Sequence, residues 1–191
     1  MTPMRVLGIS GSLRSGSHNT AILRHAGELF EAAGVQFELY QGLPSLPPFN
    51  VDDEVGDGPE LVTRLRTAVS AADAVVFATP EYNSSMPGAL KNALDWLSRP
   101  RATNVLRAKR VAVIGATTGL FGAFHAQADL RRVLAATGAR VVNREVAIGH
   151  VHTRFDATGR INDSHLQWDV QVAVDALLAQ FQPAAPEELA G

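Results

Sequence analysis

Apolar residues occur along this chain in short continuous runs, which alternate with longer stretches where they recur every three or four positions. Residues 5–9, 73–78 and 110–115 are nearly continuous apolar runs, as is typical of strands that are buried on both faces of a sheet. Residues 35–40 alternate between apolar and polar side chains and indicate an edge strand. Residues 140–148 are expected to supply one more strand. The pattern therefore predicts five strands, of which three are central.

The stretches between these runs have the period of helices. One apolar stripe covers residues 22–33 and is ended by Gly34, a second helix is expected over residues 89–97, and the last stripe covers residues 166–181. Alternating strands and helices predict an α/β fold with a parallel sheet covered on both faces, a three-layer sandwich. With the alternating strand at the edge, we expect the strand order 2-1-3-4-5, in which ligands bind between strands one and three.

The size of the chain suits one domain. It has 191 residues, of which 46% are hydrophobic and 19% charged, enough for a substantial core. We expect residues 1–181 to form a single domain and residues 182–191 to form a flexible C-terminal tail. Residues 41–59 form a Pro-rich connection, which is either a lid over a site or a surface crossing.

Charge and cysteine content limit the partners and the location. The formal net charge is −2, so no global field attracts nucleic acid or an anionic membrane surface. A basic cluster before the fourth strand is predicted to be a solvated loop. There is no cysteine, and neither a signal-peptide pattern nor an apolar run near the ~20 residues that span a bilayer is present. These features predict a cytoplasmic location without membrane contact.

The segment between the first strand and the first helix, residues 8–19, is built to bind a phosphate group. Its glycines let the backbone turn so that N–H groups converge, short side chains add donors, and an arginine adds a forked cation. The helix that follows directs its positive end at the same point. The candidate donors are Ser10, Ser12, Arg14, Ser17 and Asn19.

Two common phosphate motifs are excluded by the same segment. A triphosphate loop requires a lysine followed by Ser or Thr, but Ser17 and His18 stand at those positions. The dinucleotide motif is also absent, because Gly8, Gly11 and Gly16 are too widely spaced. The expected ligand is therefore a terminal monophosphate, such as that of FMN.

Two further loops are expected to border the same crevice. Residues 79–88 follow the third strand and contain two prolines and a tyrosine, which suits a loop that wraps around a flat heterocycle. Residues 115–122 follow the fourth strand and are small and polar. In isolation, a plain helix-start loop and a simple Gly-rich turn explain these segments about equally well. The candidate residues are Pro80, Glu81, Tyr82, Asn83, Thr117, Thr118 and Gly119.

Four groups of residues carry a resemblance to a known family. They are Gly11-Ser12-Leu13-Arg14 with Ser17 and Asn19, Pro80-Glu81-Tyr82-Asn83 with Pro87-Gly88, residues 90–98, and Phe155-Asp156 with Gly159-Arg160. Together they resemble the NAD(P)H-dependent FMN reductase family, which includes bacterial chromate and quinone reductases and azoreductases. The resemblance covers almost the whole chain.

The resemblance implies a flavodoxin-like fold, a bound FMN and a set of contacts with it. Residues 80–83 would lie along the flavin ring, and Thr117 would lie near the ring or the ribityl chain. The family also forms homodimers or homotetramers in which helices after strands three and four meet. The implied FMN phosphate contacts are Ser12, Arg14, Ser17, His18 and Asn19.

The implied reaction passes hydride from NADPH or NADH through FMN to a quinone, azo, metal-oxyanion or free-flavin acceptor. The cofactor carries this chemistry, so we expect no catalytic side chain. Two alternatives remain open, namely a flavodoxin-like electron carrier or redox-sensing protein, and a flavin reductase that supplies reduced FMN to a partner monooxygenase. His150 and His152 could share a metal ion, but no third ligand has a convincing spacing, and we expect no metal.

Overall fold

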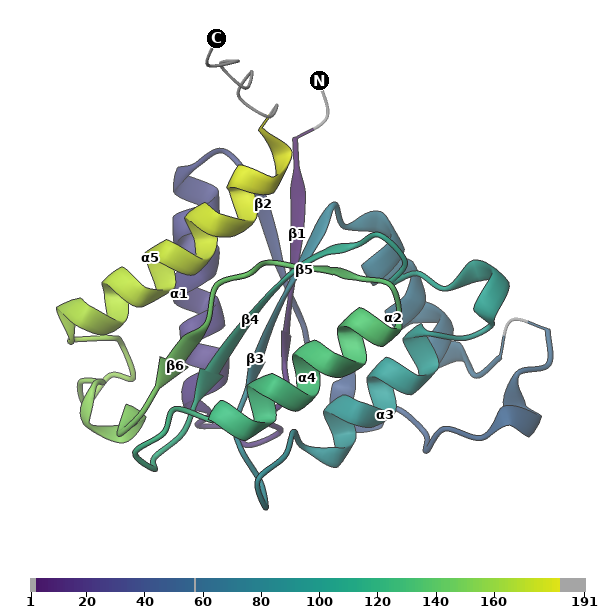
Figure 1. Cartoon of the computed structure of the whole chain (residues 1–191), viewed down its shortest axis with the longest axis horizontal. Helices are drawn as coiled ribbons and strands as arrows, with labels where there is room; N and C mark the ends of the chain where they lie inside the picture. The colour runs from purple at the N-terminus through teal and green to yellow at the C-terminus, as the bar shows by residue number, and fades with distance from the viewer. Residues whose placement is uncertain (1–2, 57, 183–191) are drawn as a thin grey trace, which may run out of the picture.

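One parallel sheet forms the centre of this computed structural model, which describes residues 3–56 and 58–182 (Figure 1). The strand order is β2-β1-β3-β4-β5, and β6 also pairs with β4. The predicted order 2-1-3-4-5 is therefore confirmed. Every residue of β3 is buried, as its apolar run predicted, whereas β2 is partly exposed at the edge. The strands are β1 (Arg5–Ser10), β2 (Gln36–Tyr40), β3 (Ala74–Thr79), β4 (Arg110–Ala116), β5 (Arg140–Val141) and β6 (Val146–Ile148).

Helices cover both faces of the sheet and form two separate cores. One face is covered by α1 (His18–Ala32) and α5 (Ser164–Leu178), and the other by α2 (Glu60–Ala71), α3 (Gly88–Leu97) and α4 (Phe124–Ala136) (Figure 1). Side chains of β3 alternate between the two cores, because neighbouring residues of a strand point to opposite faces. The carboxyl ends of the strands meet at one edge, the lower edge in Figure 1.

Local signals set the helix ends. Ser17 caps α1 by accepting a hydrogen bond from the Thr20 N–H at 3.2 Å, and Gly34 ends the stripe with φ of +77°. Asp163 caps α5 by accepting from the Leu166 N–H at 2.7 Å. This hydrogen bond, with Arg154 nearby, lowers the pKa of Asp163.

The prediction of one continuous strand over residues 140–148 is wrong, because the structure has two short strands there, β5 and β6. The ladder to β4 is interrupted because the Arg144 N–H turns back to the Val142 carbonyl at 2.8 Å. The guanidinium of Arg131, on α4, then donates to the carbonyls of Val142, at 2.8 Å, and Arg144. These side-chain bonds replace the missing ladder bonds and divide the strand into β5 and β6.

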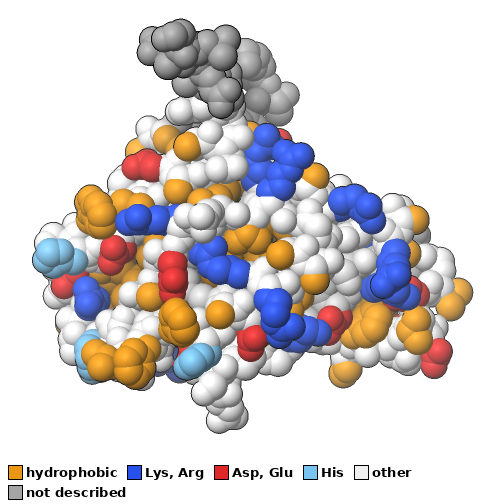
Figure 2. Space-filling view, in the orientation of Figure 1, with side chains coloured by type: hydrophobic (Ala, Val, Ile, Leu, Met, Phe, Trp, Pro, Cys, Tyr) orange, Lys and Arg blue, Asp and Glu red, His pale blue; other side chains and the backbone are white. Residues whose placement is uncertain are grey.

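Charged side chains of both signs are intermixed on one face of the molecule. Figure 2 shows Lys and Arg side chains among Asp and Glu over the face that carries α3, α4 and α5. The basic cluster before β4 is divided among separate contacts, for example Arg110, which stacks on the Phe181 ring at 4.1 Å. Among the described residues, none of the helices has the length and apolar character needed to cross a membrane. Residues 183–191 of the predicted tail lie outside the described residues, and the single domain over residues 1–181 stays a prediction.

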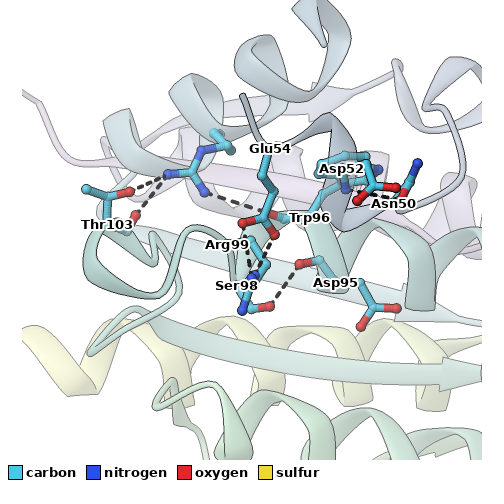
Figure 3. A network of polar contacts seen from close by, with 9 residues as sticks. Asn50, Asp52, Glu54, Asp95, Trp96, Ser98, Arg99 and Thr103 are labelled. Carbon is cyan, nitrogen blue, oxygen red and sulfur yellow. Dashed lines mark hydrogen bonds and ion pairs between the residues drawn. The ribbon is translucent and has the colours of Figure 1, made fainter. Parts of the chain in front are cut away.

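The Pro-rich connection, residues 41–59, is a surface crossing that is bonded to α3. The Pro47 carbonyl accepts from Asn92 Nδ2 and from Trp96 Nε1, each at 2.9 Å, and the Phe49 N–H donates to Asn92 Oδ1 at 2.7 Å. Further along, Glu54 forms a two-pronged ion pair with Arg99, with distances of 2.5 and 3.1 Å (Figure 3). The connection therefore lies on the outer surface of α3 and does not line the site described below.

Replacing Asn92 tests this attachment. Asn92→Ala removes two hydrogen bonds from a partly buried contact, so we expect the free energy of unfolding to fall by about 1–2 kcal/mol. Urea denaturation measures it. Lys91→Ala is the matched control, because Lys91 forms only an exposed ion pair with Asp95, worth about 0.3–0.5 kcal/mol. Equal losses in the two variants would contradict the assignment.

Candidate functional site

The loops after β1, β3 and β4 meet at the carboxyl edge of the sheet and line a cavity of about 400 Å³. This volume lies within the range of ~300–1,000 Å³ that is usual for small-molecule sites. A fourth segment, which follows β6, completes the wall. The lining residues are Ser12, Arg14, Ser17, His18, Asn19, Pro80, Glu81, Tyr82, Ala116, Thr117, Thr118, Val151 and His152.

Ten of the thirteen predicted site residues therefore line one cavity, and three do not. Ser10 lies behind the first loop, where its hydroxyl bonds Thr20 Oγ1 at 2.9 Å. Asn83 lies at the tip of a projecting turn, and Gly119 lies in the loop after β4 without reaching the cavity. Ala116, Val151 and His152 line it without having been predicted as site residues.

The glycines of the first loop have a different role from the one expected. None of Gly8, Gly11 and Gly16 has a positive φ, so the loop does not use left-handed turns. Gly11 is instead needed for close packing, because a Cβ there would lie 2.9 Å from Leu90 Cδ2. Its N–H also donates to the Ala78 carbonyl at 2.8 Å. These contacts hold the start of the loop against β3.

The first loop presents donors to the cavity. Ser17 accepts from the Thr20 N–H with its oxygen, so its hydroxyl hydrogen stays available to a ligand. Within the described residues, the N–H groups of His18 and Asn19 in the first turn of α1 have no acceptor. The guanidinium of Arg14 makes no hydrogen bond or ion pair with any described residue, and Arg14 lines the same wall. This donor set fits a phosphate group.

Asn19 presents a buried acceptor. Its side chain is 4% exposed, and Nδ2 donates to the Ala116 carbonyl at 3.0 Å. A carbonyl can only accept, so this bond fixes the orientation of the amide. Oδ1 is then left without a partner in a residue that lines the cavity. A buried acceptor of this kind requires a donor, such as a ligand hydroxyl.

The loop after β3 projects from the edge as a tight hairpin. Tyr82 and Ser85 exchange both backbone hydrogen bonds, at 3.0 and 3.1 Å, and the two residues between them, Asn83 and Ser84, have φ of +50° and +59°, a turn of the I′ kind. The base is fixed to α4, since Ser85 Oγ donates to Asp129 at 2.7 Å. This bond, with help from Arg132, lowers the pKa of Asp129.

Glu81 connects the same loop to α4. Its carboxylate accepts from the Ala126 N–H, in the first turn of α4, at 3.1 Å. An anion at that position interacts favourably with the positive end of a helix. The next side chain, Tyr82, is 53% exposed and lines the cavity. The hairpin therefore supplies an aromatic surface beside the cavity, held by contacts with α4.

The loop after β4 is joined to the segment after β6 by backbone bonds. The Val151 N–H donates to the Thr117 carbonyl at 3.1 Å, and the His150 N–H donates to the Gly119 carbonyl at 2.9 Å. These bonds hold the short helix η4 (Val151–Thr153) against the cavity. The sequence did not predict that the segment after β6 lines the cavity, because this segment contains no phosphate-binding or flavin-binding motif. Its one notable feature is the pair His150 and His152, which the sequence analysis treats as candidate metal ligands. Within the described residues, no group of three His, Cys, Asp or Glu could hold a metal ion.

The electrostatic balance of the cavity depends on His18. Partial burial lowers the pKa of His18, and the nearby charges of Arg14 and His152 lower it further. The imidazole of His18 also contacts the Phe155 ring, with centroids 4.8 Å apart. These effects favour the neutral form of His18, and Arg14 is the permanent cation among the lining residues.

A larger hollow of about 840 Å³ lies at the other end of the molecule, between the ends of α3 and α4. Two of its arginines, Arg99 and Arg132, are already paired with carboxylates. It borders helix C-termini, where the backbone dipoles disfavour anions. The smaller cavity at the carboxyl edge of the strands is the better candidate, because that edge is where open parallel sheets bind ligands.

Comparisons with known proteins agree with this geometry. Residues 4–153 match the family model described as NADPH-dependent FMN reductase. This chain belongs to that family. It is similar to an NAD(P)H-dependent FMN reductase of Pseudomonas aeruginosa, with 43% identity over 91% of this chain and 93% of the relative. It is also similar to a 2-hydroxy-1,4-benzoquinone reductase of a Burkholderia species, with 35% identity over 92% and 95%.

Solved structures of a flavoenzyme and of a flavodoxin show the same fold. The flavoenzyme FerB of Paracoccus denitrificans, an NAD(P)H:(acceptor) oxidoreductase, is 36% identical, with a TM-score of 0.81 over 92% of this chain and 98% of that one. A mutant of flavodoxin from Pseudomonas aeruginosa has a TM-score of 0.54 over 90% and 99%. The predicted family, the flavodoxin-like fold and NAD(P)H-dependent FMN and quinone reduction as the activity class are confirmed. The individual FMN contacts stay predictions.

Gly149 tests the packing of the cavity wall. A Cβ at Gly149 would lie 2.2 Å from the Leu120 carbonyl oxygen, so Gly149→Ala must displace backbone. We expect it to lower the free energy of unfolding by about 1–3 kcal/mol, measured in urea without ligand. Gly119→Ala is the control, because its nearest new neighbour is a Thr117 side-chain atom at 3.9 Å, and we expect a change within about 0.5 kcal/mol. Similar losses in both variants would show that this close approach is unimportant.

Proposed function

We propose that this chain binds FMN in the cavity at the carboxyl edge and uses NADPH or NADH to reduce a small acceptor. The observation that carries the proposal is the convergence of three features on one cavity. These are the free guanidinium of Arg14, the first turn of α1 and the unpartnered Oδ1 of Asn19. A phosphate monoester that continues into a hydroxyl-bearing chain satisfies all three.

Bound FMN would supply the hydride chemistry, by accepting hydride from the nicotinamide and passing it on. The protein would hold the phosphate with Ser12, Arg14 and Ser17 and accept a ribityl hydroxyl at Asn19. Residues 80–82 and Thr117 would border the ring, and Tyr82 would limit access of water to it. These groups bind and orient, so no side chain is assigned as acid, base or nucleophile.

The acceptor we propose is a quinone, because relatives of this chain are named as quinone reductases. Azo compounds, metal oxyanions and free flavins are further acceptors within the same proposal. An electron carrier is less well supported, because acidic and basic side chains are intermixed on the face that Figure 2 shows. Carriers usually present an acidic docking face.

We also propose that the chain works as a cytoplasmic homodimer or homotetramer. Three apolar residues, Leu120, Phe121 and Phe124, are 65%, 75% and 50% exposed, and they follow β4 close to the cavity wall. Exposed apolar groups of this kind mark contact surfaces. Light scattering of the purified protein would show a mass of two or four chains.

Steady-state oxidation of NADPH and NADH by the purified protein tests the function. With a quinone and no added flavin, we expect turnover by protein that is yellow from bound FMN. A dedicated supplier of reduced FMN would require free flavin, and an electron carrier would remain inactive under both conditions. Inactivity with quinone, with and without added FMN, would contradict the proposed reductase.

Arg14→Ala tests the phosphate contact. A charge-assisted, forked contact is worth about 1.5–3 kcal/mol, so we expect a loss of FMN affinity of this size, measured by quenching of flavin fluorescence. The Arg14 guanidinium has no hydrogen-bond or ion-pair partner among the described residues, so the urea midpoint without FMN should stay unchanged. Arg24→Ala is the control. It removes a guanidinium of α1 that does not line the cavity. If Arg14→Ala kept wild-type FMN affinity, the assignment of this loop would be wrong.

A further inference from the structure

The hairpin that carries Tyr82 is held by a helix that does not itself line the cavity. Tyr82 is a lining residue, but none of the lining residues belongs to α4. Two hydrogen bonds nevertheless join the hairpin to this helix. Glu81 accepts from the Ala126 N–H at 3.1 Å, and Ser85 Oγ donates to Asp129 Oδ2 at 2.7 Å. Tyr82 therefore lies between two residues that are each bonded to α4.

Both of these bonds end on one face of α4. Ala126 and Asp129 are three positions apart in the helix, and residues at this spacing are neighbours on a helix surface. In Figure 1 the connection between β3 and α3, which contains the hairpin, projects from the carboxyl edge of the sheet. The two ends of this projecting turn are thus fixed relative to the same rigid element.

The turn itself needs support from outside. Asn83 and Ser84 have positive φ, of +50° and +59°, and a turn of this kind favours glycine at the second of these positions. A side chain in the left-handed region adds strain. Two backbone hydrogen bonds between Tyr82 and Ser85 close the turn. The position of Tyr82 therefore depends on the contacts that the hairpin makes with α4.

The bond to Asp129 is the shorter of the two. Its length of 2.7 Å is typical of a hydroxyl that donates to an ionised carboxylate. The hydrogen bond from Ser85, followed by the one from Arg132, lowers the pKa of Asp129, so the carboxylate stays ionised at neutral pH. Arg132 donates to the other oxygen, Oδ1, at 3.1 Å. The two oxygens of Asp129 thus have separate partners, one in the hairpin and one on α4.

We infer that Asp129 is a positioning residue for the flavin ring, which acts through Ser85 to hold Tyr82 beside the cavity. This inference rests on the proposed function, because it concerns the ring side of the same cavity. Asp129 does not line the cavity, so its effect reaches the ligand through the hairpin. Met86, which follows Ser85, is buried in the core. Loss of the bond between Ser85 and Asp129 should therefore shift the hairpin and leave the fold intact.

A comparison of FMN with riboflavin separates the ring side of the cavity from the phosphate side, because riboflavin has the same ring and no phosphate. The proposed phosphate donors lie in the first loop, and the hairpin forms a different wall. We expect Asp129→Ala to weaken the binding of both flavins equally, by roughly 3- to 10-fold, the range of one hydrogen bond. Loss of a phosphate contact would instead weaken FMN binding more than riboflavin binding.

The test measures the Kd of FMN and of riboflavin by fluorescence quenching for wild type and matched variants. Ser85→Ala removes the same bond from its other end, so it should match Asp129→Ala, and the double variant should bind no more weakly than either single variant. Asp129→Asn keeps an oxygen that can accept from Ser85 and should bind within about twofold of wild type. Arg132→Ala is the control, because it removes the bond to Asp129 Oδ1 and leaves the bond to Ser85.

Hydrogen exchange in the protein without ligand gives an independent measurement. The N–H groups of Tyr82 and Ser85 each donate to the carbonyl of the other residue, so their exchange rates report how often the hairpin opens. NMR should show faster exchange of both groups in Asp129→Ala than in wild type. Arg132→Ala should exchange at the wild-type rate.

The inference is overturned if Asp129→Ala binds both flavins like wild type, if it weakens FMN binding alone, or if its effect adds to that of Ser85→Ala. Unchanged exchange of the two N–H groups in Asp129→Ala would also overturn it, as would an equal loss of binding in Arg132→Ala. These outcomes leave the proposed function standing as long as wild type binds FMN. Failure of wild type to bind either flavin would overturn the proposed function as well.

Discussion

The candidate site depends on the hydrogen bond from Asn19 to the Ala116 carbonyl. This bond connects the beginning of α1 with the end of β4 across the carboxyl edge of the sheet. The parallel sheet brings these two points together, because all of its strands end at the same edge. The bond uses the donor end of a buried amide, and the acceptor end therefore remains for a ligand. One contact thus stabilises the loop arrangement and leaves a specific polar group beside the cavity.

The rest of the chain leaves this edge open. The Pro-rich connection could have covered the site as a lid, but Asn92 and Trp96 bind it to the outside of α3 through the Pro47 carbonyl. The loop after β4 is restrained from the other side by the segment after β6. A nicotinamide and an acceptor that use one site in turn need such an opening, and the walls of this one are held by hydrogen bonds.

The sequence could predict the layers and most of the cavity, because both depend on local patterns. Buried runs predicted the central strands, and the carboxyl-edge rule predicted that three loops lie together. The split between β5 and β6 could not be predicted, because it results from hydrogen bonds that the side chain of Arg131, on the preceding helix α4, makes with backbone carbonyls. His152 was missed as a wall residue for a similar reason, since its position depends on long-range backbone bonds. The glycines were correctly associated with the site, but Gly11 serves close packing against Leu90.

Charge at the cavity must satisfy two opposite requirements. A site that binds a phosphate dianion needs positive charge, but several fixed cations in one place repel one another when no anion is present. Here the lining contains one arginine, Arg14, with a helix N-terminus and two histidines. Burial and the neighbouring positive charges lower the pKa of His18, so its charge is absent when it would be unfavourable.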